Sequence, residues 1–127
     1  MTRVFVVKSF RRWQRKQRIG DGALCDAVAR AENGIIDADL GGGLIKQRVA
    51  RPGQARSGGY RTLIGYREHA RAVFLFGFAK NEQDNVNAGE LETWKTIGRD
   101  LLKALPAGIE DMIAKGTLTE LDCGQIN

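Results

Sequence analysis

"YRTLIGYREHARAVFLFGFA", residues 60 to 79, contains two strand patterns separated by a short polar turn. The first pattern, over residues 59 to 67, alternates aromatic or β-branched residues with others, as strands do. The second, over residues 72 to 79, is apolar at odd and even positions alike except at Gly77, which predicts a central strand covered on both faces. Residues 68 to 70 between them suffice only for a hairpin turn. The stretch therefore predicts an antiparallel hairpin at the centre of a sheet.

Elements on either side of this hairpin complete the pattern of a small α+β fold. In chain order they are a strand at 4–7, helices at 9–18 and 21–33, a strand at 44–49, and helices at 87–105 and 107–115. The expected architecture is a short N-terminal strand, a two-helix hairpin, an antiparallel three-stranded sheet and C-terminal helices. At this length, residues 1–127 are expected to form a single domain.

Capping residues locate the ends of these helices. Asp21 is the candidate N-cap of the second helix, and Gly34 is its expected stop. Asn87 and Glu90 resemble a capping box at the start of the third helix. The tail at 116–127 either adds an edge strand or stays mobile.

Positive charge is concentrated in two blocks of the sequence. The chain has 20 Lys and Arg against 15 Asp and Glu, a formal net charge of +5. Residues 1–18 carry seven basic and no acidic side chains, and residues 44–80 carry eight basic and one acidic. If the fold brings these blocks together, one face is strongly positive, which favours an anionic partner.

The cysteines and the single histidine indicate in which cellular compartment the chain is expected and whether it can bind a metal. The two cysteines, Cys25 and Cys123, are far apart, and the N-terminus has no signal-peptide pattern, so a reduced, cytoplasmic chain is expected. No apolar stretch reaches the ~20 residues of a membrane span, so no membrane partner is expected. The single histidine, His69, falls in the hairpin turn and is expected to be solvated. These residues cannot assemble a tetrahedral zinc set, and neither a metal nor a cofactor is expected.

The segment "RVARPGQARSGGYR", residues 48 to 61, holds four arginines, three glycines and a proline. Gly53 and Gly58 match the first part of a nucleotide-binding phosphate loop. However, Gly59 and Tyr60 stand where that loop needs Lys and Ser or Thr, and a strand follows instead of a helix. The sequence therefore excludes a nucleotide loop.

Strand pairing predicts instead that basic residues converge at one end of the sheet. Pairing through the turn at 68–70 places residues 58–61 beside residues 77–80, and Arg48 comes opposite Arg61. The residues gathered there are Lys46, Arg48, Arg51, Arg56, Arg61, Lys80 and Asn81. Clustered cations repel one another unless an anion binds, which favours an anion site; the alternative is an ordinary solvated strand face.

Two strings carry a resemblance to a known family. "GGGLIKQRVARPGQARSGGYRTLIGYR" at 41–67 and "VFLFGFAKNEQDN" at 73–85 resemble the signature of RelE/HigB-type toxins of bacterial type II toxin–antitoxin systems. The resemblance implies a cytoplasmic toxin, a ribosome-dependent mRNA endoribonuclease that inhibits translation. In such enzymes the 2′-hydroxyl attacks the adjacent phosphate without a metal. The implied partners are mRNA, the ribosome and a cognate antitoxin, usually a helix-turn-helix protein, through which alone operator DNA is bound.

The same resemblance assigns roles to individual residues. Arg61 and Lys80 are expected to hold the scissile phosphate, with Lys46 and Arg48 contacting the message or assisting proton transfer. The remaining expected RNA contacts are Arg51 and Arg56, Asn81 beside the phosphate, and Arg11, Arg12 and Arg15 on the first helix. Tyr60 and Tyr66 either stack on an unstacked base or pack against the helices.

Asn81 departs from the family pattern, because many relatives have arginine or histidine there. Asp84, Asn85 and Asn87 likewise stand where relatives have tyrosine or histidine. Three alternatives stay open: a lysine with a lowered pKa acts as the base, catalysis rests on positioning and electrostatics, or the chain does not cleave RNA. The competing functions are a ParE-like inhibitor of DNA gyrase and a non-catalytic component that binds its partner and operator DNA.

Overall fold

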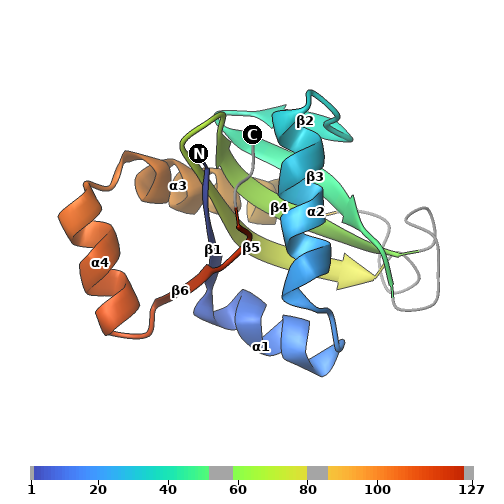
Figure 1. The fold of residues 1–127 in the computed structure, drawn as a ribbon. Coiled ribbons are helices and arrows are strands. Elements are labelled where there is room, and N and C mark those ends of the chain that lie inside the picture. The colour runs from blue at the N-terminus through green and yellow to red at the C-terminus, as the bar shows by residue number, and fades with distance from the viewer. Residues whose placement is uncertain (1, 52–58, 80–85, 125–127) are drawn as a thin grey trace.

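The computed structural model describes residues 2–51, 59–79 and 86–124, and this part of the chain folds around one six-stranded mixed sheet (Figure 1). The strands are β1 (Arg3–Val7), β2 (Ala38–Gly41), β3 (Leu44–Val49), β4 (Tyr60–Arg67), β5 (Arg71–Ala79) and β6 (Leu118–Leu121). Their order across the sheet is β2-β3-β4-β5-β1-β6. The α+β fold class predicted from the sequence is confirmed, with the expected three antiparallel strands forming the central part of a wider sheet.

The β4–β5 hairpin has the predicted position and nearly the predicted register. Arg67 pairs with Arg71 beside the turn, and Tyr60 pairs with Ala79 at the other end. One irregularity between Leu63 and Ile64 shifts the register by a single residue along the hairpin. β5 lies between β4 and β1 and is buried on both faces, as its apolar pattern predicted.

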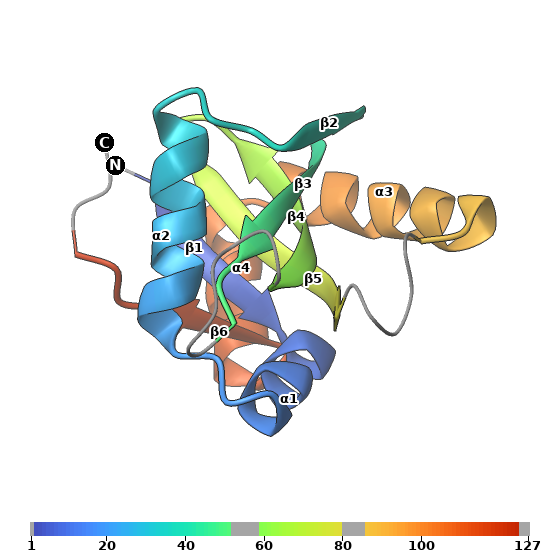
Figure 2. The same ribbon diagram turned by 90° about the vertical axis from the view of Figure 1, so that its right-hand side faces the viewer.

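The helices lie in two layers, one on each face of the sheet. α1 (Lys8–Lys16) and α2 (Asp21–Glu32) cover one face, and α3 (Ala88–Lys103) and α4 (Pro106–Ala114) pack on the other. Figure 2 shows α2 and α3 on opposite sides of the sheet. Each layer has its own apolar core, because successive residues of a strand point to opposite faces.

Two of the three predicted cap assignments are confirmed, and one is wrong. The Asn87 side chain accepts a hydrogen bond from the Glu90 backbone N–H at 2.9 Å, and Gly34 ends α2 at φ 81°. The N-cap of α2 is Gly20 rather than Asp21. Asp21 is the first helical residue, and its carboxylate is turned toward α1.

β2 was not predicted from the sequence, and β6 was only one of two alternatives for the tail. β2 lies in a short acidic, glycine-rich connector whose strand tendency is weak, and it forms by pairing with β3. β6 pairs antiparallel with β1, so residues 118–121 of the tail adopt the edge-strand alternative.

Cys25 and Cys123 form a disulfide, with Cα atoms 5.5 Å apart. The prediction that both thiols are reduced is therefore wrong for this structure. Pairing of β6 with β1 brings the end of the chain to α2, a proximity that the sequence separation of 98 conceals. None of the helices that the structure describes is long and apolar enough to cross a membrane.

Candidate nucleic-acid interface

Three of the predicted cationic residues share one face of the sheet. Lys46 and Arg48 alternate along β3, and the predicted pairing of Arg48 with Arg61 of β4 is confirmed. Cross-strand partners point to the same side of a sheet, so all three side chains lie on the face that carries α3. The pairing of Arg61 with Phe78 in β5 agrees with this, since Phe78 belongs to the core beneath α3.

Arg61 has an incompletely satisfied guanidinium. Its Nη1 atom is buried and has no hydrogen-bond partner within the described residues. A buried donor without a partner costs free energy, and a charged donor costs more. A phosphate oxygen would satisfy this nitrogen with a charge-assisted hydrogen bond, so Arg61 is suited to receive an anion.

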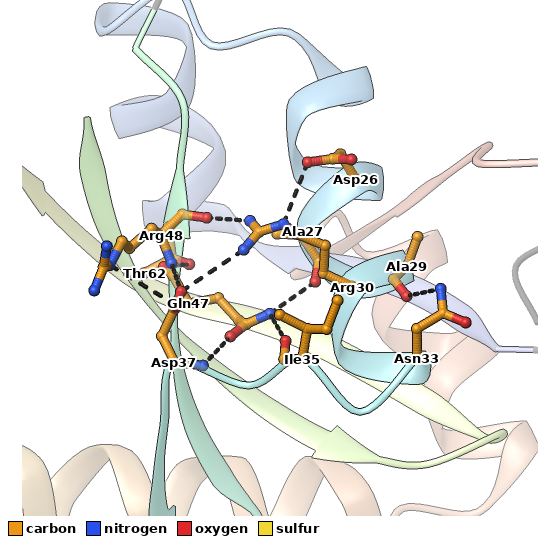
Figure 3. A network of polar contacts seen from close by, with 10 residues as sticks. All are labelled: Asp26, Ala27, Ala29, Arg30, Asn33, Ile35, Asp37, Gln47, Arg48 and Thr62. Atoms are coloured by element: carbon orange, nitrogen blue, oxygen red, sulfur yellow. Dashed lines mark hydrogen bonds and ion pairs between the residues drawn. The ribbon is translucent and has the colours of Figure 1, made fainter. Parts of the chain in front are cut away.

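Arg48 is oriented by Asp37 but stays open to solvent. Its Nε atom lies 3.8 Å from Asp37 Oδ1, and its backbone N–H donates to Asp37 Oδ2 at 2.7 Å. The Arg48 side chain is nevertheless 46% exposed. Asp37 also lies 3.7 Å from Nη1 of Arg30, which donates from α2 to the Arg48 carbonyl through Nη2. One carboxylate thus holds the strand end while leaving a cation available (Figure 3).

Gln47 fixes the segment that carries Asp37, and the sequence analysis missed it. Its buried amide Nε2 donates to the carbonyls of Ala27 and Ile35 at 3.0 and 3.1 Å, and its Oε1 accepts from the Asp37 N–H at 2.7 Å (Figure 3). A signal was present in the sequence. Gln47 is polar, but the residues two positions before and after it in the strand are apolar, so alternation places its side chain on the buried face. A glutamine on a buried strand face needs internal partners.

Arg51 follows β3 and lies over the Tyr60 ring, with Cζ 5.5 Å from the ring centroid. Tyr60 itself is only 2% exposed, packs edge-on against Trp13, and donates its hydroxyl to Gln17 Oε1 at 3.2 Å. The structure therefore supports the packing alternative for Tyr60, because the ring offers no open face to a base.

Tyr66 lies near the hairpin turn, at the other end of β4 from Arg61. Its hydroxyl donates to Glu32 Oε2 at 2.7 Å. Burial, and then the hydrogen bond and charge of Glu32, raise the pKa of this phenol. Its position also favours packing over base stacking.

The three arginines predicted on the first helix have different surroundings. Arg12 and Arg15 are exposed, whereas Arg11 Nη1 donates to Asp21 Oδ1 at 2.6 Å and to Gln14 Oε1 at 3.1 Å. Burial alone would raise the pKa of Asp21, but hydrogen bonds from Gln14 and Arg11 outweigh it and the pKa is lowered. Arg11 thus connects α1 to the start of α2, and this contact competes with its expected role in RNA binding.

Arg56, Lys80 and Asn81 lie outside the described residues. The structure does place Ala79, the residue before Lys80, opposite Tyr60 in the strand pairing. The chain therefore leaves β5 at the end of the sheet that carries Arg61 and Arg48.

One group of potential cation ligands occurs within the described ranges. Glu32, Glu68 and His69 lie around the hairpin turn, with His69 Nδ1 3.6 Å from Glu32 and Nε2 3.2 Å from Glu68. Glu32 also accepts from the His69 backbone N–H and from Tyr66. These contacts account for the group as a polar anchor of the turn, and we assign no metal to it.

The fold and the site together define an α+β protein with Arg48 and Arg61 paired at one end of its sheet. The chain belongs to the RelE toxin family, whose model, described as the RelE toxin of the RelE / RelB toxin–antitoxin system, matches residues 2–121. No curated protein matches the chain at a significant level. The resemblance inferred from the sequence strings is thereby confirmed at the level of the family, which implies an antitoxin partner.

Proposed function

We propose that the protein is a ribosome-dependent mRNA endoribonuclease that stops translation and is neutralised by its antitoxin. Membership of the RelE family supports the activity, since toxins of this family are generally endoribonucleases. The observation that carries the proposal for this chain is the unpartnered, buried Nη1 of Arg61 on the face shared with Arg48 and Lys46.

The proposed reaction is an internal transfer at one phosphodiester. The ribose 2′-oxygen forms a bond to the adjacent phosphorus while the bond from phosphorus to the 5′-oxygen breaks. A proton leaves the 2′-hydroxyl and another reaches the leaving oxygen, giving a cyclic phosphate and a free 5′-hydroxyl end. Negative charge grows on the phosphate oxygens, where guanidinium groups stabilise it.

We assign the residues of this step as follows. Arg61 and Lys80 hold the scissile phosphate and Asn81 orients it. Arg48 and Lys46 contact the message or assist proton transfer, and Arg51 and Arg56 bind RNA backbone. Side-chain cations supply the charge stabilisation that a metal supplies in other nucleases, so the proposed step uses no metal.

The proposed partners follow from this activity. We propose that the exposed cations of α1, Arg12 and Arg15, contact RNA on the translating ribosome while the sheet end holds the scissile phosphate of the message. A helix-turn-helix antitoxin would block that sheet end and carry the complex to operator DNA. Because its target is translating ribosomes, the toxin is proposed to act in the cytoplasm.

Primer extension on translated mRNA after induction tests the proposal. The wild type should produce cuts in codon register, and Arg61→Ala combined with Lys80→Ala should abolish both cuts and growth arrest. Arg67→Ala is the matched control, because Arg67 lies on the same strand and face but at the hairpin end.

Two results would count against the proposal. Full toxicity in a double variant whose circular dichroism matches the wild type would overturn the site assignment. Intact mRNA accompanied by DNA damage would indicate the alternative, inhibition of gyrase.

A further inference from the structure

Trp13 of α1 is held in a fixed position beside β5. Its ring meets Tyr60 edge-on with centroids 5.2 Å apart and lies 5.3 Å from Phe10. It also covers Gly77, where an added Cβ would stand 2.2 Å from Trp13 Cζ3. β1 pairs with β5 only as far as Phe74, so α1 covers the part of β5 that follows. The ring is therefore rigid before any ligand arrives.

Part of the Trp13 ring is nonetheless accessible. The Trp13 side chain lines two open hollows on the surface. Arg12, Trp13 and Lys16 line one of them, and Ser9, Phe10, Trp13, Leu75, Phe76 and Gly77 line the other. Arg12 and Lys16 are exposed and lie four residues apart, so both flank Trp13 on one side of the helix. An aromatic ring held beside two cations is an arrangement that can bind an unpaired base together with its phosphate.

This arrangement adjoins the sheet end that carries Arg61. Tyr60 precedes Arg61 in β4 and touches Trp13 on the opposite face of the sheet. Arg51 also contacts Tyr60, with its Cζ atom 5.5 Å from the ring centroid. Contacts thus run from Arg51 through the buried Tyr60 ring to Trp13 of α1, and none of the residues of β3, β4 or α1 is acidic.

We propose that Trp13 is a stacking subsite for a base of single-stranded RNA, with Arg12 and Lys16 binding the phosphate beside that base. The subsite extends the phosphate site at Arg61 and rests on the proposed RNA-binding function. Core packing alone explains the buried edge of Trp13, but it does not explain the flanking pair of cations or the accessible remainder of the ring.

The two tryptophans of the chain allow a direct test. Trp94 belongs to α3 and stacks on Phe76, on the other face of the sheet from Trp13. Trp94→Phe leaves Trp13 as the only tryptophan, and Trp13→Phe leaves Trp94. We titrate each variant with a 2′-O-methyl RNA oligonucleotide, which lacks the nucleophile and cannot be cleaved. Quenching is expected in Trp94→Phe and not in Trp13→Phe; quenching only in Trp13→Phe overturns the proposal.

Affinity measurements separate stacking from general charge attraction. Trp13→Leu should weaken oligonucleotide binding about tenfold or more, the usual effect of losing one stacked base. An oligonucleotide with abasic positions should bind the wild type more weakly but distinguish little between the wild type and Trp13→Leu. Arg12→Gln should weaken binding, whereas Lys8→Gln, an equal change of charge at the start of the same helix, should not.

The outcomes distinguish this subsite from the function on which it rests. Equal affinity of wild type and a folded Trp13→Leu variant would overturn the subsite while RNA binding at Arg61 stands. If the wild type binds no oligonucleotide, and its Trp94→Phe form shows no quenching, both proposals fail.

Discussion

Gly77 controls how closely α1 approaches the sheet. Because a methyl group there would lie 2.2 to 2.7 Å from three atoms of the Trp13 ring, Gly77→Ala must displace that ring. We expect the free energy of unfolding to fall by about 1–3 kcal/mol, the usual cost of overpacking. Urea unfolding followed by circular dichroism measures this.

Gly108→Ala provides the control for Gly77→Ala. Gly108 lies in α4, and an added Cβ there meets no atom within 4 Å. Alanine favours helix over glycine by up to about 1 kcal/mol, so the control should match or exceed the wild type in stability. Equal stability of the two variants would show that Trp13 shifts freely.

Gln47 is the second residue whose replacement has a defined cost. Gln47→Leu keeps the side-chain volume but leaves the Asp37 N–H and the carbonyls of Ala27 and Ile35 without their amide partner. Each buried polar group left unsatisfied costs about 1–3 kcal/mol. We expect a total loss of roughly 2–4 kcal/mol in urea unfolding, since water reaches part of the Asp37 site. A loss below about 0.5 kcal/mol would contradict the role assigned to this network.

At the scale of elements, the sequence predicted what depends on local pattern. The β4–β5 hairpin follows from an alternating pattern, an apolar run and the three-residue turn between them, and the start of α3 follows from Asn87 and Glu90. Pairing between distant segments left no such local signal. The parallel contact of β1 with β5 and the pairing of β2 with β3 depend on the assembled sheet.

In the candidate site, too, local pattern predicted some contacts, whereas others depend on the packing of distant segments. The pairing of Arg48 with Arg61 followed from hairpin geometry, and the structure confirms it. The burial of Tyr60 under Trp13 and the contact of Arg11 with Asp21 depend on where the helices pack. Strand alternation predicts which side chains lie on the same face of the sheet, but not which helix covers that face.

The disulfide joins α2 to the segment after β6, and its removal tests how far that link stabilises the fold. A bridge closing a loop of 98 residues restricts the unfolded chain, with a contribution of about 2–4 kcal/mol typically and about 5 kcal/mol at most. We expect dithiothreitol to lower the melting temperature of the wild type and to leave a variant carrying Cys25→Ser and Cys123→Ser unchanged.

Thiol titration of the denatured protein checks the starting state for this experiment. Oxidised wild type should show no free thiol before reduction and two after it. In a reducing cytoplasm the bridge would open, so the reduced form must still fold if the toxin acts on ribosomes. A reduced protein that is unfolded at growth temperature would contradict the proposed compartment.

At the scale of the molecule, the position of charge matters more than its total. The net charge of +5 arises from cations concentrated at residues 1–18 and 44–80, with acidic residues mostly elsewhere. The structure places Arg48 and Arg61 at one end of β3 and β4, and Arg67 at the other end of β4. If RNA is attracted by the charge of the whole surface, these arginines should contribute equally to RNA binding. If a specific site binds the RNA, their contributions should differ.

The salt dependence of binding separates these two cases. Each phosphate contacted by a cation releases condensed counterions, which adds about −0.7 to the slope of log K against log salt for single strands. We expect Arg48→Gln to make the slope less steep by about 0.7, and Arg67→Gln to leave it unchanged, although each removes one positive charge. Binding of a 2′-O-methyl oligonucleotide between about 50 and 200 mM salt measures both slopes. Identical slopes for the two variants would mean that net charge attracts the RNA and that the end of the sheet holds no particular phosphate.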